Sequence, residues 1–127
     1  ARAGSDKRYS FGDDEKELTR YAWYQDNSEY QAHPVASKDA NRWGLSDMHG
    51  NVWEWVQDCW HADYTGASTD GSAWESGDCQ KRVLRGGAFN LAAEDLRSAN
   101  RGRESPEEKV QFIGFRYSRG PRRLLTN

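Results

Sequence analysis

Aliphatic side chains are scarce in this sequence, and their scarcity disfavours one large class of folds. The 127 residues include one Ile, five Val and seven Leu. Strands of a doubly wound parallel sheet are buried on both faces and are typically rich in these residues, so we do not expect that architecture. The sequence also lacks any run of about 20 apolar residues, the length that a membrane-spanning helix needs. We therefore expect no membrane span.

Aromatic residues compensate for the missing aliphatic ones. Leu, Ile, Val and Phe together make up 17 residues, a fraction low enough to indicate disorder in a chain of high net charge. The net charge is only −2, however, and six Trp and six Tyr are present. Each aromatic ring can bury on the order of 150–250 Å² of surface. The composition therefore predicts a small folded core of aromatic rings, with many loops, few helices and short strands.

Charge is divided unevenly between the two halves of the chain. Residues 1–63 carry 7 basic and 12 acidic side chains, whereas residues 64–127 carry 11 basic and 8 acidic ones. A basic half invites a nucleic-acid interpretation, but acidic residues interrupt it and no DNA- or RNA-binding motif is present. A mixed, solvated surface fits this pattern better, and we expect no nucleic-acid partner.

The two cysteines, Cys59 and Cys79, lie 20 positions apart and lack the CxxC spacing of a zinc site. The segment between them is rich in Gly, Ser, Thr and Asp, which is typical of a loop. A disulfide that closes this loop could contribute about 3 kcal/mol by restricting the unfolded chain. Such a bond would favour an extracytoplasmic or cell-surface location. The alternative is a pair of free thiols.

Short segments of helix and strand can be placed along the chain. Asp13 or Asp14 can cap a helix over residues 13–24, because acidic side chains favour the first turn. Alternation of side chains predicts an interior strand over residues 51–58, on which Glu54 has little access to water. We expect further strands at 82–86 and 112–118, an irregular stretch at 60–80 and a tail at 119–127.

Three blocks follow one another in the sequence and carry a resemblance. They are NRWGLSDMHGNVWEW at 41–55, RVLRGGAF at 82–89, and LRSANR at 96–101 followed by IGFR at 113–116. From about Tyr9 to Arg116 the chain resembles the formylglycine-generating-enzyme-like, or sulfatase-modifying-factor, domain family. The resemblance implies an α+β fold of the C-type-lectin-like class, rich in loops, with short antiparallel strands and few helices.

The resemblance also bears on how much of a domain is present. Family domains are usually longer, and the start of this sequence resembles the middle of one of them. We therefore expect residues 1–118 to form the C-terminal half of a domain and residues 119–127 to be a tail. Half a domain should expose apolar surface. The expected partner is the missing N-terminal half, present as another chain or segment and covering the tryptophan side.

The resemblance raises the question of catalysis. Formylglycine-generating enzymes oxidise a sulfatase cysteine with two cysteines that hold copper, because soft thiolates suit copper(I). In this sequence those two positions fall at Leu91 and Leu96, which can neither bind a metal nor carry redox chemistry. We expect no copper site, no catalytic residue and a non-catalytic role.

The alternative is a metal-dependent oxidase or oxygenase of the formylglycine-generating or carbon–sulfur bond-forming type, or an accessory domain of one. Iron-binding histidines of the second type lie largely in another domain. In this sequence His33, His49 and His61 lack paired metal-ligand spacing. We expect His49 to be a hydrogen-bonding residue of the turn in which it lies.

A structural calcium ion is a second implication of the resemblance. Carried over by position, its ligands would be the side chains of Asp47 and Glu54 and the carbonyls of Gly50 and Val52. Calcium prefers such hard oxygen ligands, and a metal would account for a carboxylate between two tryptophans. The alternative is that Glu54 accepts backbone N–H bonds or pairs with an arginine. The candidate arginines are Arg42, Arg82 and Arg85.

Residues between the three blocks mix apolar, acidic and basic types without a period, and loops on a rigid frame are frequent recognition surfaces. This layout resembles the variable proteins of diversity-generating retroelements, in which the segment after RVLRGG is diversified and binds ligands. An ordinary solvated loop surface is the alternative. The candidate ligand-binding residues are Phe89, Asn90, Leu91, Glu94, Asp95, Asn100, Arg103, Glu104, Glu108, Lys109 and Gln111. The sequence does not identify the protein or small molecule that would bind.

Overall fold

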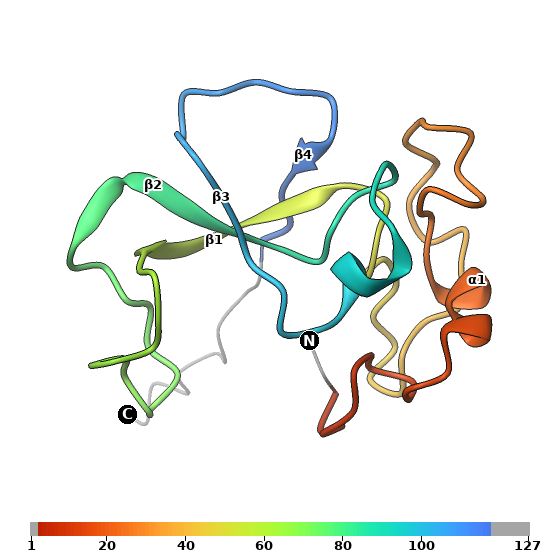
Figure 1. Ribbon diagram of the computed structural model, residues 1–127, viewed down its shortest axis with the longest axis horizontal. Coiled ribbons are helices and arrows are strands. Elements are labelled where there is room, and N and C mark those ends of the chain that lie inside the picture. Colours follow the sequence, from red (N-terminus) through yellow and green to blue (C-terminus); the bar gives the residue numbers. More distant parts are fainter. Residues whose placement is uncertain (1–2, 118–127) are drawn as a thin grey trace, which may run out of the picture.

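The computed structural model describes residues 3–117 as a four-stranded sheet with an N-terminal segment of loops and short helices beside it (Figure 1). The order of elements is η1 Glu15–Glu17, α1 Leu18–Tyr21, β1 Trp53–Trp60, β2 Asp78–Arg85, η2 Ala93–Leu96, β3 Gly102–Glu104 and β4 Ile113–Gly114. The fold is α+β, and most of the described residues lie in loops. No helix among residues 3–117 is long and apolar enough to cross a bilayer.

The helix expected over residues 13–24 is much shorter than predicted. The side chain of Asp14 does cap its start by accepting a hydrogen bond from the Lys16 N–H. The helix ends at Ala22, whose backbone is extended. The Asn27 side chain accepts from the Tyr24 N–H and donates to the Ala22 carbonyl, both at 2.9 Å. These bonds satisfy backbone groups that a longer helix would have used.

The sheet is mixed, with the strand order β3-β2-β1-β4. β2 pairs antiparallel with both β1 and β3, as expected, but β4 pairs parallel with β1. The interior strand predicted at 51–58 is confirmed as β1, two residues later along the chain. The last predicted strand shrinks to Ile113–Gly114, and residue 118 of that prediction lies outside the described residues.

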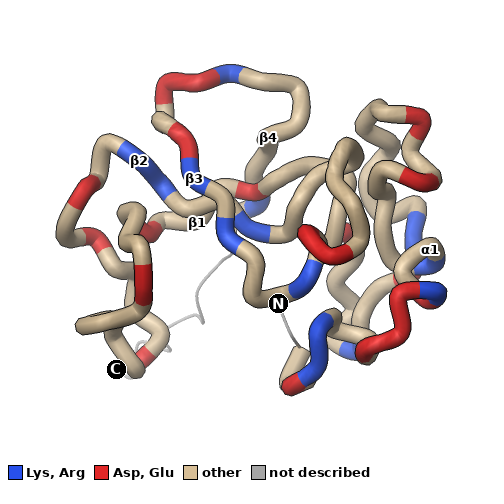
Figure 2. Tube along the Cα trace, in the orientation of Figure 1, with Lys and Arg blue, Asp and Glu red and all other residues tan. Residues whose placement is uncertain are grey.

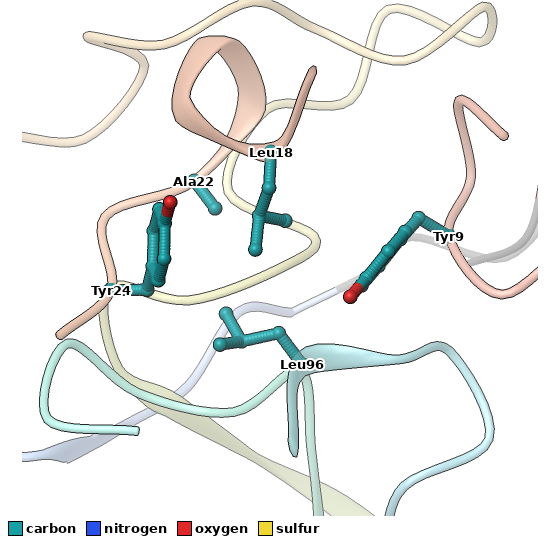
Figure 3. Close-up of a cluster of buried hydrophobic side chains, with 5 residues drawn as sticks. All are labelled: Tyr9, Leu18, Ala22, Tyr24 and Leu96. Carbon is teal, nitrogen blue, oxygen red and sulfur yellow. The ribbon is translucent and has the colours of Figure 1, made fainter. Parts of the chain in front are cut away.

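The core lies between the N-terminal segment and η2 (Figure 3). Tyr9, Leu18, Ala22, Tyr24 and Leu96 form one buried cluster. The Tyr9 hydroxyl donates to the Ala93 carbonyl at 2.9 Å, so the polar end of this ring is satisfied. Aromatic rings therefore do contribute to the core, as the tyrosines of this cluster and as Phe89, which is also buried. All six tryptophans are half-buried or exposed.

The side chain of His49 is only 2% exposed. Its hydrogen bonds link its own turn to the segments that contain Ser10 and Leu96. Its Nε2 accepts from the Ser10 backbone N–H at 3.1 Å, and its Nδ1 lies 2.8 Å from the Leu96 carbonyl. Because a carbonyl only accepts, Nδ1 carries the proton and the ring is neutral. Burial lowers the pKa of His49 below its ordinary value of 6.5. The expectation of a hydrogen-bonding turn residue is confirmed.

Candidate functional site

The four residues expected to bind calcium line one cavity of about 440 Å³. Asp47, Gly50, Val52 and Glu54 lie on the turn that leads into β1 and on β1 itself. Gly50 has φ +73°, and a Cβ placed there would lie 2.2 Å from the Trp23 carbonyl oxygen, so only glycine fits this turn. The cavity therefore depends on local backbone geometry at Gly50.

Asp47 supplies a buried carboxylate oxygen that has no hydrogen-bond partner. The residue is 9% exposed. Its Oδ2 accepts from the Ala36 N–H at 2.7 Å, whereas its Oδ1 is buried without a partner. A buried acceptor without a donor is costly. A hard cation in the cavity would remove that cost.

Glu54 lies mostly out of water, with 18% of its side chain exposed, and it pairs with Arg116. The Arg116 Nε lies 2.9 Å from Oε1 and 2.7 Å from Oε2. Arg116 also donates to the carbonyls of Ser46 and Asp47 at 3.1 and 3.0 Å. Hydrogen bonding to Glu54 raises the pKa of Arg116.

The three arginines proposed as partners of Glu54 make other contacts, so that expectation is wrong. Arg42 donates to the Ala3 carbonyl and Arg82 to the Gln57 carbonyl. Arg85 donates to three consecutive carbonyls after η2. The true partner reaches Glu54 because β4 pairs in parallel with β1, opposite Glu54 at Gly114. This long-range pairing is not visible as a local spacing in the sequence.

The chemistry of these groups is of the kind that a hard cation prefers. Asp47 has a carboxylate oxygen without a hydrogen-bond partner, and Glu54 lines the same cavity together with Gly50 and Val52. No group of three or more His, Cys, Asp and Glu side chains gathers anywhere in residues 3–117. The expected calcium ligands include only two such side chains. Arg116 already shares Glu54, so a cation would have to compete with or lie beside this guanidinium.

The two leucines that the resemblance places at the family's cysteine positions lie at the core. Leu96 is fully buried in the cluster around Tyr9, and Leu91 packs against the same cluster. The chain has two cysteines, Cys59 and Cys79, and they form a disulfide that joins β1 to β2. Neither a thiol nor a thiolate is therefore available in this chain to bind copper between the two leucine positions.

The expected ligand-binding residues divide by exposure. Phe89 is 3% exposed, and its carbonyl accepts from the Ser28 hydroxyl, so it belongs to the interior and cannot contact a ligand at the surface. Leu91, Asp95, Asn100 and Glu104 are half-buried. The exposed residues are Asn90, Glu94, Arg103, Glu108, Lys109 and Gln111.

The exposed candidates also divide in space. Asn90 lies just before η2 and Glu94 within it, beside the N-terminal segment, whereas residues 103–111 lie on β3 and on the β3–β4 connection that arches over the sheet (Figure 1). The structure does not bring these two groups into one patch. Figure 2 shows Lys and Arg interleaved with Asp and Glu along the described trace rather than gathered on a single basic face.

The sequence predicts Arg103 as a ligand-binding residue but does not indicate the cluster of aromatic and arginine side chains around it. The guanidinium carbons of Arg101 and Arg103 both lie 4.7 Å from the centre of the Trp60 ring. Arg101 also lies 4.5 Å from the centre of the Tyr64 ring. Contacts of this kind are attractive because a ring face is electron-rich. The only local signal was the pair of arginines around Gly102.

Comparisons with known proteins agree with the blocks seen in the sequence. The model of the sulfatase-modifying factor enzyme 1-like domain matches residues 1–120. The chain is 42% identical over 89 residues to the serine/threonine-protein kinase pkn1 of Chlamydia caviae, covering 68% of this chain and 14% of that protein. It is 34% identical over 97 residues to the formylglycine-generating enzyme of Thermomonospora curvata, covering 69% of this chain and 31% of the enzyme.

Two solved structures share the fold. PvdO from Pseudomonas aeruginosa superposes with a TM-score of 0.81 at 39% identity, covering 91% of this chain and 46% of PvdO. The Treponema denticola variable protein 1 superposes with a TM-score of 0.77 at 35% identity, covering 91% of this chain and 41% of that protein. The chain thus spans less than half the length of each of these similar proteins.

Proposed function

The chain belongs to the sulfatase-modifying factor enzyme 1-like domain family, and from this premise we propose that it is a non-catalytic ligand-binding domain. Loop side chains are presented to a ligand by a lectin-like frame. Arg85 and Arg116 hold the frame by bonding to carbonyls of two different loops. The ligand contacts Arg103 on β3 and the exposed residues of the β3–β4 connection.

The observation that carries the proposal is the pair of leucines at positions 91 and 96. Leu96 fills the core, and both cysteines of the chain are consumed in a disulfide remote in sequence from these positions. Oxidation of a substrate thiol by the family's copper chemistry requires two thiolates that the chain does not offer. The domain retains the scaffold and lacks the redox groups.

The binding surface is supported by the chemistry of β3 and of the β3–β4 connection. Arg103 is exposed over the Trp60 ring, and no carboxylate of residues 3–117 forms an ion pair with it. A stacked, unpaired guanidinium is pre-organised to receive a carboxylate or phosphate. Glu108, Lys109 and Gln111 on the same connection add exposed polar contacts. Loops of this kind suit recognition because the sheet holds their ends.

The proposed absence of catalysis is tested with a cysteine-containing sulfatase peptide. Purified chain is loaded with copper(I) and exposed to oxygen, and formylglycine is measured by mass spectrometry. We expect no aldehyde product. Product formation that is abolished by a Leu91→Ala or Leu96→Ala substitution would overturn the non-catalytic role and favour the oxidase alternative.

The proposed ligand binding is tested with a random peptide library. Peptides selected on the wild-type chain are measured against Arg103→Ala, with Arg20→Ala as a matched control on α1. We expect at least a tenfold loss of affinity for Arg103→Ala and none for the control. Selected peptides that bind both variants equally would place recognition elsewhere and contradict the proposal.

The likeness to a variable protein supports a diversified surface. If the domain is diversified, related copies from one source differ mainly within residues 89–112, whereas the frame arginines and the residues of β1 stay constant. Sequencing such copies checks this. Differences that avoid residues 89–112 would leave a binding domain with a fixed surface.

A further inference from the structure

A cavity of about 460 Å³ lies in the N-terminal part of the chain. It is formed by the loop that precedes η1, by Tyr21 at the end of α1 and by residues 40–42. Cavities of this size hold small molecules when an apolar wall is combined with a few polar groups. The cavity shares no residue with the one around Asp47 or with the β3–β4 connection, so it is a separate candidate site.

Asn41 places a buried hydrogen-bond donor in the wall of this cavity. The residue is 8% exposed. Its Oδ1 accepts from the backbone N–H groups of Trp43 and Leu45 at 2.9 and 3.1 Å, which identifies its other terminal atom as the amide nitrogen. That nitrogen, Nδ2, has no hydrogen-bond partner. A buried donor without an acceptor is costly, and an oxygen atom of a bound molecule would remove this cost.

Arg42 brings a positive charge to the same cavity. Its side chain is exposed, and its Nε donates to the Ala3 carbonyl. No carboxylate of residues 3–117 forms an ion pair with it. Its terminal nitrogens are therefore available to a carboxylate, which a guanidinium can hold through two parallel hydrogen bonds. The other two charged residues of the lining, Asp6 and Lys7, pair with each other at 3.6 Å.

Ring edges form the apolar wall of the cavity. Phe11 stacks against both Tyr9 and Tyr21, with ring centroids 5.1 and 4.3 Å apart and planes 6° and 7° from parallel. Because this stacking covers the faces of the Phe11 ring, the ring meets the cavity with its edge. An aromatic edge is electropositive and packs favourably against the face of another ring. The wall therefore suits an aromatic group.

We propose that this cavity binds a small carboxylate that carries an α-hydroxyl or α-oxo group and an aromatic ring. The carboxylate pairs with Arg42, and the α-oxygen accepts a hydrogen bond from Asn41 Nδ2. Asn41 and Arg42 are adjacent in the sequence and line one cavity, so the two oxygen groups that they bind are also expected to be neighbours. The aromatic ring of the ligand packs against the edge of Phe11.

The test titrates phenyllactate into isotope-labelled protein and follows the side-chain amide signals of Asn41 by NMR. We expect these signals to shift and to reach saturation. Two analogues each remove one group: phenylpropionate lacks the α-hydroxyl, and phenyllactamide lacks the charge. Each should bind at least tenfold more weakly than phenyllactate, because one polar contact is lost.

Substitutions assign the contacts to residues. Arg42→Gln should weaken phenyllactate binding at least tenfold, whereas Arg97→Gln alters an exposed arginine outside the cavity and should leave it unchanged. Asn41→Asp keeps the oxygen that accepts from Trp43 and Leu45 and replaces the free donor by an acceptor, so it should abolish binding. If Asn41→Asp does not fold, the exposed Arg42 side chain still decides the outcome.

Four results would overturn the proposal. They are the absence of a saturable shift with phenyllactate, equal binding of phenyllactamide, equal binding of phenylpropionate, and wild-type affinity in Arg42→Gln. Arg103→Ala should bind phenyllactate as the wild type does, since Arg103 does not line this cavity. This site and the peptide-binding surface on β3 can therefore fail independently of each other.

Discussion

The Arg85 side chain acts mainly by bonding to backbone carbonyls. Arg85 donates to the carbonyls of Ala99 and Asn100 at 3.1 and 3.0 Å, and its other terminal nitrogen lies 2.8 Å from the Tyr64 hydroxyl. A guanidinium offers five hydrogen-bond donors in a fixed plane, so one side chain can bond to several carbonyls of a loop. In a chain with few helices and strands, such side-chain bonds fix loops that have few backbone hydrogen bonds of their own.

His49 provides a pH-dependent contribution to stability. Its pKa is lowered in the folded state by burial, whereas the unfolded chain titrates near 6.5. Above that pH both states are neutral and stability should not depend on this group. Below it the unfolded chain binds the proton first, so the free energy of unfolding should fall with decreasing pH, at most about 1.4 kcal/mol per pH unit. Urea unfolding between pH 5 and pH 8 measures this.

Substitution separates His49 from other groups that titrate in the same range. His49→Gln keeps one donor and one acceptor but cannot take up the proton, and it should flatten the decline below pH 6.5. His61→Gln is the matched control, since it leaves His49 intact and should keep the decline. A decline of the same size in all three proteins would show that His49 is not its source.

At the scale of elements, the disulfide closes the long connection between β1 and β2. Cys59 and Cys79 are separated by 20 residues, and residues 61–77 contain no helix or strand. Replacing both by Ala should lower the free energy of unfolding by about 3 kcal/mol, because the unfolded chain regains the freedom of the open loop. Denaturant unfolding with and without reductant measures the loss.

The reductant supplies the control. It should destabilise the wild type and leave the Cys59→Ala/Cys79→Ala protein unchanged. An equally stable wild type in reductant would mean that the bond contributes little. A measured loss would favour the extracytoplasmic or cell-surface location proposed from the cysteine pair, since that contribution requires an oxidising environment.

Local patterns in this sequence predict where helices and strands lie. They do not show which strands pair when those strands are far apart in the sequence. Alternation located β1, and the acidic start of the helix located its cap at Asp14. The helix ends early because the Asn27 side chain takes its backbone bonds. For the site, the four residues that the resemblance assigns to calcium line one cavity, and their binding of calcium stays a prediction. The partner of Glu54 was missed, because a parallel strand 62 residues later brings Arg116 to it.

At the scale of the whole molecule, the hydrophobic core is small and most of the described residues lie in loops. The buried cluster joins the N-terminal segment to η2, while the sheet lies to one side of it (Figures 1 and 3). Stability therefore depends on contacts that cross between these parts. The turn from Asp47 to Val52 is such a crossing, because the Gly50 N–H donates to the Gly86 carbonyl and the Asn51 N–H donates to that of Trp23.

A calcium ion at this crossing should stabilise the entire fold. Asp47 and Glu54 would hold it with the carbonyls of Gly50 and Val52, and the buried Oδ1 of Asp47 would gain the partner that it lacks. An ion that binds only the folded state adds about 2.7 kcal/mol at a hundred times its dissociation constant, which corresponds to several degrees in Tm for a domain of this size. We expect millimolar calcium to raise Tm of the wild type. Magnesium should raise it less, because it demands a stricter geometry.

Two single substitutions decide whether that shift arises at Asp47. Asp47→Asn keeps the size of the side chain and removes its charge, so the calcium-induced rise in Tm should shrink or vanish. Asp26→Asn alters an exposed acid outside the cavity and should keep the full rise. If calcium stabilises Asp47→Asn as much as the wild type, the ion binds elsewhere. If calcium changes no Tm at all, Arg116 alone neutralises Glu54, and the fold is held at this turn by a guanidinium instead of a metal.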